Sequence, residues 1–321
     1  MRGLRTASQF QRIQPYSHGL LKTRFLFSPA SLQYTRLVST TTSLPAKTPR
    51  SFLVNGPATT LPATLDVPVR GEDQPFFPGY ALALGKSYLN FYKTGVKNIY
   101  TNFRLSRHIQ HTIDSQHASS LSSAVSSGAL SRSDFQLLIR NWHDIKRVPI
   151  FALLFMICGE FTPLIVIALS NIVPWTCRIP KQVESDRRKL EQRRSTSFRN
   201  LTTEPPTEER VDKLSRPQLL HISWSLGLSS QMWDWVGGLP TGLLRRKVTR
   251  RVHYLELDDG LIRDAGGVGE MNSEEVKMAL VERGVDVLGK KDPQLKGDLN
   301  SWLKSREKVP AERLLLTRYK S

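Results

Sequence analysis

The chain has 321 residues, and its 46 Lys and Arg against 28 Asp and Glu give a formal net charge of +18. This excess favours an anionic partner, either a nucleic acid or an anionic lipid surface, and it leaves the fold open. The two cysteines, Cys158 and Cys177, exclude a disulfide framework, and the length allows two domains of about 150 residues each.

The first 43 residues are expected to be a mitochondrial presequence. Residues 1–65 contain no Asp or Glu, and residues 1–50 combine eight Lys and Arg with many Ser and Thr. This composition is typical of mitochondrial targeting segments, and Arg36 lies where processing would follow. The alternative is an ordinary basic tail. Residues 44–79, which are rich in Pro and Thr and lack periodicity, are expected to be a linker.

Residues 80–147 are expected to form helices that precede an apolar segment. Apolar residues recur there at helical spacing: Leu82, Leu89, Tyr92, Val96, Ile99 and Phe103. This face predicts a helix that packs against a partner helix or lies on a membrane surface. Residues 115–130, rich in Ser and Ala, are expected to form a loop. Ser131 predicts the N-cap of a helix over 131–147, with Asp134 completing a capping box.

Residues 148–170 are apolar apart from Glu160, Thr162 and Ser170. At about 1.5 Å per residue, a helix of this length covers about 34 Å, enough to cross a hydrocarbon core of about 30 Å. Soluble helices are seldom apolar on every side over such a length, so a transmembrane helix is preferred over a buried core helix. The expected fold class is all-α: a single-pass membrane protein with an all-helical matrix domain over 171–321.

Two residues within this segment are unusual for a transmembrane helix. A central carboxyl group such as Glu160 costs about 2.5–3.5 kcal/mol on insertion scales, and Pro163 removes a helix hydrogen bond. Glu160 and Pro163 are therefore candidates for an ion or proton pathway. The alternative is structural, a protonated or paired carboxyl group that transports nothing. One span cannot enclose a pathway, so transport would require a homo-oligomer.

A basic cluster follows the apolar segment directly. Residues 178–199 contain eight Lys and Arg against three acids. By the positive-inside rule, this excess places the C-terminal domain in the matrix. The cluster could contact anionic headgroups or RNA, and the alternative is a solvated helix.

The C-terminal domain is expected to contain short helices with recognisable ends. Ser215 and Gly227 bound the first, and Pro240 precedes the second. Asn272 predicts a capping box with Glu275 for the third helix, which forms a hairpin with a fourth that opens at Asp292.

The second of these helices carries the densest row of basic residues on a predicted element. Its apolar face consists of Leu244, Val248, Val252 and Leu255. The basic residues lie mostly around the rest of the helix: Arg245, Arg246, Lys247, Arg250 and Arg251. Such a row neutralises phosphates without reading sequence, which makes it a candidate RNA-binding site. The alternative is a solvated helix face.

The sequence contains no catalytic or nucleotide-binding signature. Residues 266–269, with three glycines, lack the Lys and Ser/Thr of a P-loop, and residues 256–260 fail the ligand spacing of an EF-hand. We therefore expect no enzymatic activity, no cofactor and no metal.

Three stretches in order resemble the LETM family, the mitochondrial leucine zipper and EF-hand-containing transmembrane proteins. They are residues 130–163, which lead from LSRSDFQLLIRNWHDIKRVPIF into GEFTP, residues 214–219 (LSRPQL), and residues 267–303. Glu160 and Pro163 match the family's intramembrane acid and proline. The family's EF-hands and long C-terminal coiled coil are absent from this sequence, so the resemblance is to short members, without calcium sensing or zipper assembly.

The resemblance implies an inner-membrane protein whose helical matrix domain binds the mitochondrial ribosome, through rRNA or a ribosomal protein. It also implies roles in inner-membrane protein biogenesis and ion homeostasis, with inner-membrane lipids as partners and no DNA, and it leaves a homo-oligomer open. Two alternatives remain. One is an oligomeric cation/proton exchanger that acts through Glu160. The other is an assembly factor that binds another membrane protein through the face Phe135–Ile145.

Overall fold

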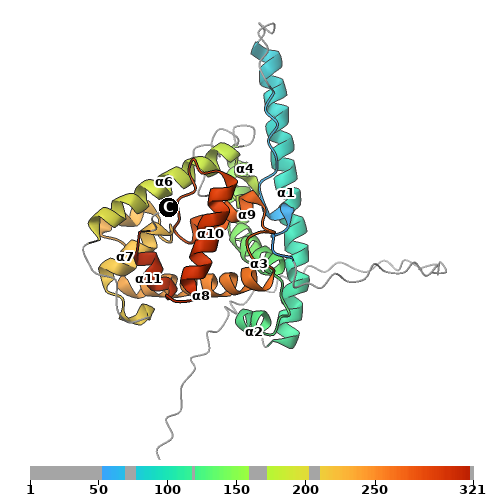
Figure 1. Ribbon diagram of the computed structural model, residues 1–321. Coiled ribbons are helices and arrows are strands. Elements are labelled where there is room, and N and C mark those ends of the chain that lie inside the picture. The colour runs from blue at the N-terminus through green and yellow to red at the C-terminus, as the bar shows by residue number, and fades with distance from the viewer. Residues whose placement is uncertain (1–52, 69–76, 118–119, 159–171, 202–209, 319–321) are drawn as a thin grey trace, which may run out of the picture.

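The regular elements of the described chain are all helical (Figure 1). The computed structural model describes residues 53–68, 77–117, 120–158, 172–201 and 210–318. In chain order the elements are η2 (Ala58–Thr60), α1 (Phe77–Gln116), α2 (Leu121–Ser126), α3 (Arg132–Ile145), α4 (Val148–Cys158), η4 (Trp175–Cys177), α6 (Pro180–Asn200), η5 (Val211–Lys213), α7 (Arg216–Ser225), η6 (Gln231–Val236), α8 (Thr241–Asp264), α9 (Ser273–Glu282), α10 (Asp292–Arg306) and α11 (Ala311–Leu316). The all-α prediction is confirmed for these residues.

The long helix α1 forms where predicted, but it packs through a different face. Of the predicted apolar face, Ile99 is buried, whereas Leu82 and Leu89 are 78 % and 67 % exposed. The buried side includes a polar residue, Asn102, whose amide nitrogen donates to the Thr59 carbonyl at 2.9 Å. An apolar pattern cannot identify a face that packs partly through hydrogen bonds, which explains the difference.

A short helix, α2, lies within the stretch predicted to be a loop. The Ser120 hydroxyl accepts a hydrogen bond from the Ser123 N–H at 3.3 Å and so caps the helix, and Ala124 is fully buried beside Ile113. Serine hydroxyls compete with helical hydrogen bonds inside a helix but stabilise its first turn. The loop prediction for residues 115–130 is therefore wrong at 115–116, where α1 ends, and at 121–126.

The helix α3 begins as its sequence predicts. The Ser131 hydroxyl accepts from the Asp134 N–H at 3.1 Å, and the Asp134 carboxylate accepts from the Ser131 N–H at 3.4 Å. The predicted capping box is confirmed. Part of the predicted linker packs against this helix, because the Val54 carbonyl accepts from the Arg132 guanidinium at 2.7 Å. This part of residues 44–79 is folded onto the body. The predicted presequence, residues 1–43, lies outside the described residues.

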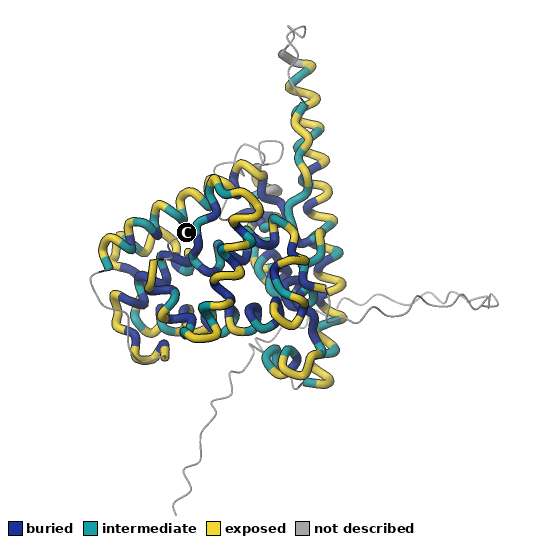
Figure 2. The backbone as a smooth tube through the Cα atoms, viewed as in Figure 1, coloured by how far each residue is buried: buried dark blue, intermediate teal, exposed yellow. Residues whose placement is uncertain are grey.

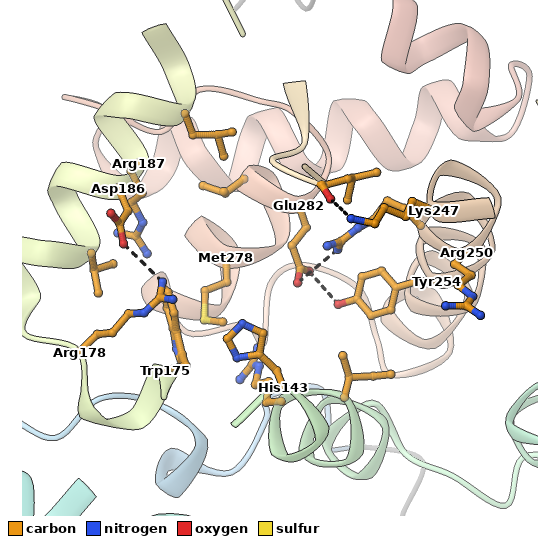
Figure 3. A pocket seen from close by; sticks show the side chains of 17 residues that line it. His143, Trp175, Arg178, Asp186, Arg187, Lys247, Arg250, Tyr254, Met278 and Glu282 are labelled. Carbon is orange, nitrogen blue, oxygen red and sulfur yellow. Dashed lines mark hydrogen bonds and ion pairs between the residues drawn. The ribbon is translucent and has the colours of Figure 1, made fainter. Parts of the chain in front are cut away.

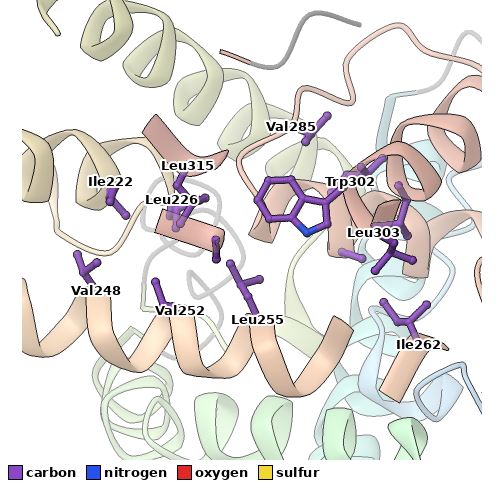
Figure 4. Close-up of a cluster of buried hydrophobic side chains, with 14 of the residues drawn as sticks. Ile222, Leu226, Val248, Val252, Leu255, Ile262, Val285, Trp302, Leu303 and Leu315 are labelled. Atoms are coloured by element: carbon purple, nitrogen blue, oxygen red, sulfur yellow. The ribbon is translucent and has the colours of Figure 1, made fainter. Parts of the chain in front are cut away.

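The C-terminal domain is organised around the buried face of α8. Its four predicted core residues, Leu244, Val248, Val252 and Leu255, are at most 4 % exposed. They pack against apolar side chains from the neighbouring helices, among them Ile222, Leu226, Leu280, Leu299, Trp302 and Leu315 (Figure 4). Helical spacing alone thus predicts this core face correctly.

Buried ion pairs join α3 to this domain. Arg132 Nε lies 2.8 Å from Asp258 Oδ1, and Arg140 Nη1 lies 2.6 Å from Glu275 Oε1. Arg283 Nη2 contacts Asp258 Oδ2 at 2.7 Å from the other side. These five side chains are at most 8 % exposed. The helices α8 and α9, both distant in sequence from α3, therefore hold α3 in place through charge pairs that solvent does not reach.

The environment of these acids keeps them charged. Burial by itself raises the pKa of Asp258, but Arg132 and Arg283 hold it well below its usual range. Burial likewise opposes ionisation of Glu275, and Arg140 lowers its pKa. Because Glu275 is engaged with α3, it does not cap its own helix. No side-chain cap forms at Asn272, so the predicted capping box of α9 is wrong.

The structure describes the first part of the apolar segment as α4, which begins at Val148 and ends at Cys158. Residues 159–171 lie outside the described residues. Within the described ranges, no helix is both long enough and apolar enough to cross a membrane. The helices α3 and α8, one before and one after the apolar segment, are in contact.

A buried histidine makes the stability of the fold depend on pH. The His221 ring lies between the hydroxyls of Ser197 and Ser225, with Nδ1 2.8 Å from the first and Nε2 3.3 Å from the second. Burial lowers the pKa of His221, so the folded state favours the neutral ring. The unfolded chain, with a pKa of about 6.5, then binds more protons in weakly acidic solution. The stabilising contribution is therefore full above about pH 6.5 and is lost as the pH falls.

We expect His221→Gln to reduce the loss of unfolding free energy between about pH 7.5 and 5.5. Carboxylates contribute little in this window, because unfolded Asp and Glu titrate near pH 4. Urea denaturation in mild detergent at both pH values measures the slope. The substitution His111→Gln, at an exposed site on α1, should keep the wild-type slope. An unchanged slope in His221→Gln would remove His221 as a source of the pH dependence.

Candidate functional site

The basic row of α8 divides into an exposed stripe and two half-buried residues. Leu243, which is 47 % exposed, shares one side of the helix with three exposed basic residues at positions i+3, i+4 and i+7: Arg246, Lys247 and Arg250. This spacing brings side chains onto one face of a helix. We call these four residues the exposed stripe. Its three basic residues are the part of the predicted row that a large partner can reach.

The other two basic residues of the row are less accessible. Arg251 lies over the Tyr254 ring at 5.1 Å and pairs with Glu282 at 3.7 Å, while the Tyr254 hydroxyl donates to the same carboxylate at 2.7 Å. Burial raises the pKa of Tyr254, which keeps this hydroxyl protonated as a donor. Arg245 is half-buried as well. Arg251 thus serves the packing of α8 on α9.

A pocket of about 590 Å³ lies between α3, α6, α8 and α9 (Figure 3). Its lining includes Met278, Lys247 and Arg250. Arg178, which also lines the pocket, pairs with Asp186 at 3.4 Å and lies over the Trp175 ring at 5.3 Å. Burial lowers the pKa of Arg178, and Asp186 opposes this shift. The positive charge of Arg178 is therefore compensated within the protein, by Asp186.

An exposed aromatic turn precedes α8. In η6, Trp235 is 94 % exposed, Met232 80 % and Val236 70 %, and none of its residues is buried. Isolated exposed apolar residues are common, but a contiguous patch of large ones marks an interaction site. Tryptophan and methionine are also enriched in protein interfaces. The patch is therefore a candidate contact with another macromolecule.

Contacts on both sides hold this turn in place. Arg193 pairs with Asp234 at 2.7 Å and donates to the Ser229 carbonyl at 2.7 Å. Arg216 donates to the Gly237 carbonyl at 3.1 Å, and Gly237 adopts φ +76°, a left-handed conformation that glycine accepts without strain. Trp235 thus projects from a fixed base, so less conformational entropy is lost on binding.

The turn and the stripe are neighbours. Lys247 Nζ donates to the Leu228 carbonyl at 2.8 Å, two residues before the N-cap of η6, Ser230. We call the combined surface the basic–aromatic face, and it consists of Met232, Trp235, Val236, Leu243, Arg246, Lys247 and Arg250. Cations and large apolar groups together suit a macromolecular partner that offers both negative charge and apolar surface.

The sequence indicated only the basic half of this face. The segment QMWDWVGGLP, residues 231–240, lacks helical periodicity, so no pattern predicted which of its side chains are buried. Its signal was compositional: two tryptophans and a methionine in a short turn closed by Gly and Pro. The other predicted site residues, Glu160 and Pro163, lie outside the described residues.

Two family models match the chain. The family described as LETM1-like, RBD matches residues 206–320, which include α7 to α11 and the whole basic–aromatic face. The pentamidine resistance factor domain matches residues 112–222, a stretch that includes α3, the apolar segment and α6. No solved structure is significantly similar to the chain. On the first match, residues 206–320 form a domain of the LETM1-like family.

Proposed function

We propose that this protein holds mitochondrial ribosomes at the inner membrane and thereby supports inner-membrane protein biogenesis and ion homeostasis. Residues 148–170 lie in the bilayer and the C-terminal domain lies in the matrix. The protein acts by binding, without catalysis. The observation that carries the proposal is the match to the LETM1-like ribosome-binding domain over residues 206–320, because those residues build the basic–aromatic face.

The basic half of the face contributes electrostatic contacts to docking, and the aromatic half contributes buried apolar area. Arg246, Lys247 and Arg250 neutralise rRNA phosphates, which gives binding that is insensitive to sequence and sensitive to salt. Trp235 and Met232 bury apolar area against a ribosomal protein, which adds a contribution that salt does not screen. The ribosome thus meets the domain through rRNA and protein together, and membrane lipids contact the apolar segment.

We expect the triple variant Arg246→Gln, Lys247→Gln, Arg250→Gln to bind ribosomes more weakly and with less salt dependence. A plot of log affinity against log salt has a negative slope. Each lost phosphate contact makes this slope shallower by about 0.7–0.9, so the loss of three contacts makes it shallower by about 2–3. The measurement is co-migration with the large ribosomal subunit through sucrose gradients, from mitochondria lysed in mild detergent at a series of salt concentrations.

A matched control removes the same charge elsewhere in the domain. The variant Lys304→Gln, Lys308→Gln, Arg313→Gln changes three exposed residues of α10, α11 and their connection. It should sediment like the wild type. If both variants lose co-migration equally, overall charge and not the basic–aromatic face binds the ribosome. If neither changes, the assignment of these three residues is wrong.

The structure bears differently on the two alternative functions. The assembly-factor alternative used the face Phe135–Ile145 as a partner contact, but Phe135 is fully buried and stacks on Tyr254 at 5.5 Å. That part of the face is occupied by the protein's own domain. The exchanger alternative depends on Glu160, and no described residue adds support for it.

A further inference from the structure

The two ends of the apolar segment lie side by side. Asp144, at the end of α3, precedes the segment, and η4 follows it. The Asp144 carboxylate accepts hydrogen bonds from the Trp175 N–H at 2.6 Å and from the Thr176 N–H at 3.3 Å. Asp144 is 3 % exposed, so its charge is compensated by these amides inside the protein. A single side chain thus ties the start of the segment to its end.

A small apolar cluster fixes the same junction. Phe151, near the start of the segment, and Val173, at its end, are buried together with Ile99 of α1 and Cys177. At Gly95 of α1, an added Cβ atom would lie 2.7 Å from Cys177 Sγ and 3.1 Å from the Thr176 carbonyl oxygen. Only a glycine allows η4 to approach α1 this closely. Both ends of the segment therefore rest on one short stretch of α1.

The helices beyond these ends also belong to one folded body. The pair Arg132–Asp258 is 1 % and 0 % exposed, and Arg140 binds Glu275 through two hydrogen bonds, at 2.6 and 2.8 Å. Placing α3 across a hydrocarbon core of about 30 Å from α8 would break every one of these contacts. Each separated ion left in the protein interior would cost several kcal/mol.

We infer that the apolar segment leaves the bilayer on the face by which it entered, so that residues 77–147 and 172–318 lie on one side of the membrane. This rests on the proposed membrane location of residues 148–170 and replaces their single crossing. One family model runs without a break from 112 to 222, across the segment and both of its flanks.

The hydrocarbon of the bilayer is the partner of the surface beside this junction. On α4, Ile150 and Leu153 are each 56 % exposed, Ile157 74 % and Met156 81 %. The sequence that follows α4 is mostly apolar up to residue 170. Figures 1 and 2 show α1 extending past the helical body at the end where α4 lies, with much of its surface exposed.

Cysteine labelling in mitoplasts tests the topology. The two native cysteines are removed by Cys158→Ala and Cys177→Ala, and single cysteines are introduced by Ser115→Cys before the segment or Ser301→Cys after it, both at exposed positions. A membrane-impermeant maleimide is added to intact mitoplasts or after detergent. We expect both positions to give the same result in each condition. Labelling of one position in intact mitoplasts and of the other only after detergent overturns the inference.

The outcomes separate this inference from the proposed function. If both positions are protected until detergent is added, both proposals are supported. If both are labelled in intact mitoplasts, the same-side topology holds but the domain is outside the matrix, and ribosome docking fails. If alkaline carbonate extracts the wild-type protein from the membrane, the segment is not embedded and the inference fails.

The wild-type chain gives a second measurement in case removal of Cys177 disturbs folding. Trypsin added to mitoplasts should either leave the chain intact or digest both flanks of the apolar segment. A protected fragment that contains only residues 172–321, or only the residues before 148, overturns the inference.

Discussion

Replacing Arg283 with Met is expected to lower the free energy of unfolding by about 3–5 kcal/mol. The Arg283 side chain is fully buried, 2.7 Å from Asp258 and 2.6 Å from Asp259. These neighbours raise the pKa of Arg283, against the opposing effect of burial. Methionine removes the positive charge from between two buried carboxylates, so both lose a partner that solvent cannot replace.

Urea denaturation of the detergent-solubilised protein, followed by far-ultraviolet circular dichroism, measures this loss. Arg283→Lys retains the charge without the planar fork and should fall between the wild type and Arg283→Met. Arg313→Met, at an exposed position on α11, should change stability by less than about 0.5 kcal/mol. Equal stability of Arg283→Met and the wild type would show that the network is not a buried ionic core.

Replacing Trp235 with Ser is expected to weaken ribosome binding by about 30-fold while leaving the fold unchanged. Interface tryptophans are frequent hot spots, and about 2 kcal/mol of lost binding energy corresponds to this factor. Because Trp235 is 94 % exposed in the free protein, its removal costs little packing. Titration of isolated mitochondrial large subunits with purified protein measures the affinity, and denaturation measures the stability.

The matched control is another exposed aromatic residue outside the basic–aromatic face. Tyr100 on α1 is 62 % exposed, and Tyr100→Ser should leave the affinity unchanged. Comparable losses in both variants would indicate nonspecific apolar adhesion. Unchanged affinity in Trp235→Ser would limit the docking surface to the basic stripe of α8.

The elements that the sequence predicted correctly depend on local chemistry. The Ser131 capping box involves residues three positions apart, and the core face of α8 repeats with the period of its own helix. The capping hydrogen bonds and the apolar period both involve residues a few positions apart, so one short stretch of sequence is enough to predict each of them.

The features that were missed depend on contacts between distant residues. Glu275 carries the sequence signature of a capping residue, but Arg140, 135 positions away, binds it instead. Likewise, the exposed apolar residues Leu82 and Leu89 fit a helical packing pattern without being packed. Tertiary contacts determine which of several locally acceptable faces and partners is used.

The topology of the apolar segment shows the same limit. The hydropathy and length of residues 148–170 are sufficient for a crossing. Whether the chain emerges on the opposite face depends on where its ends are held, and that is decided by Asp144 bound to η4 and by Arg132 bound to α8. In the same-side arrangement, a single apolar segment does not reach from one compartment to the other. Glu160 alone would therefore not provide an ion pathway between them.

Site-specific photocrosslinking from position 235 tests the docking of the ribosome most directly. A photoreactive phenylalanine analogue replaces Trp235, or Lys304 as an exposed control, and mitochondria are irradiated before lysis. We predict adducts from position 235 that contain a large-subunit ribosomal protein or rRNA, and none from position 304. The absence of ribosomal adducts from position 235, with the protein folded and in the membrane, would contradict the proposal that the basic–aromatic face docks the ribosome.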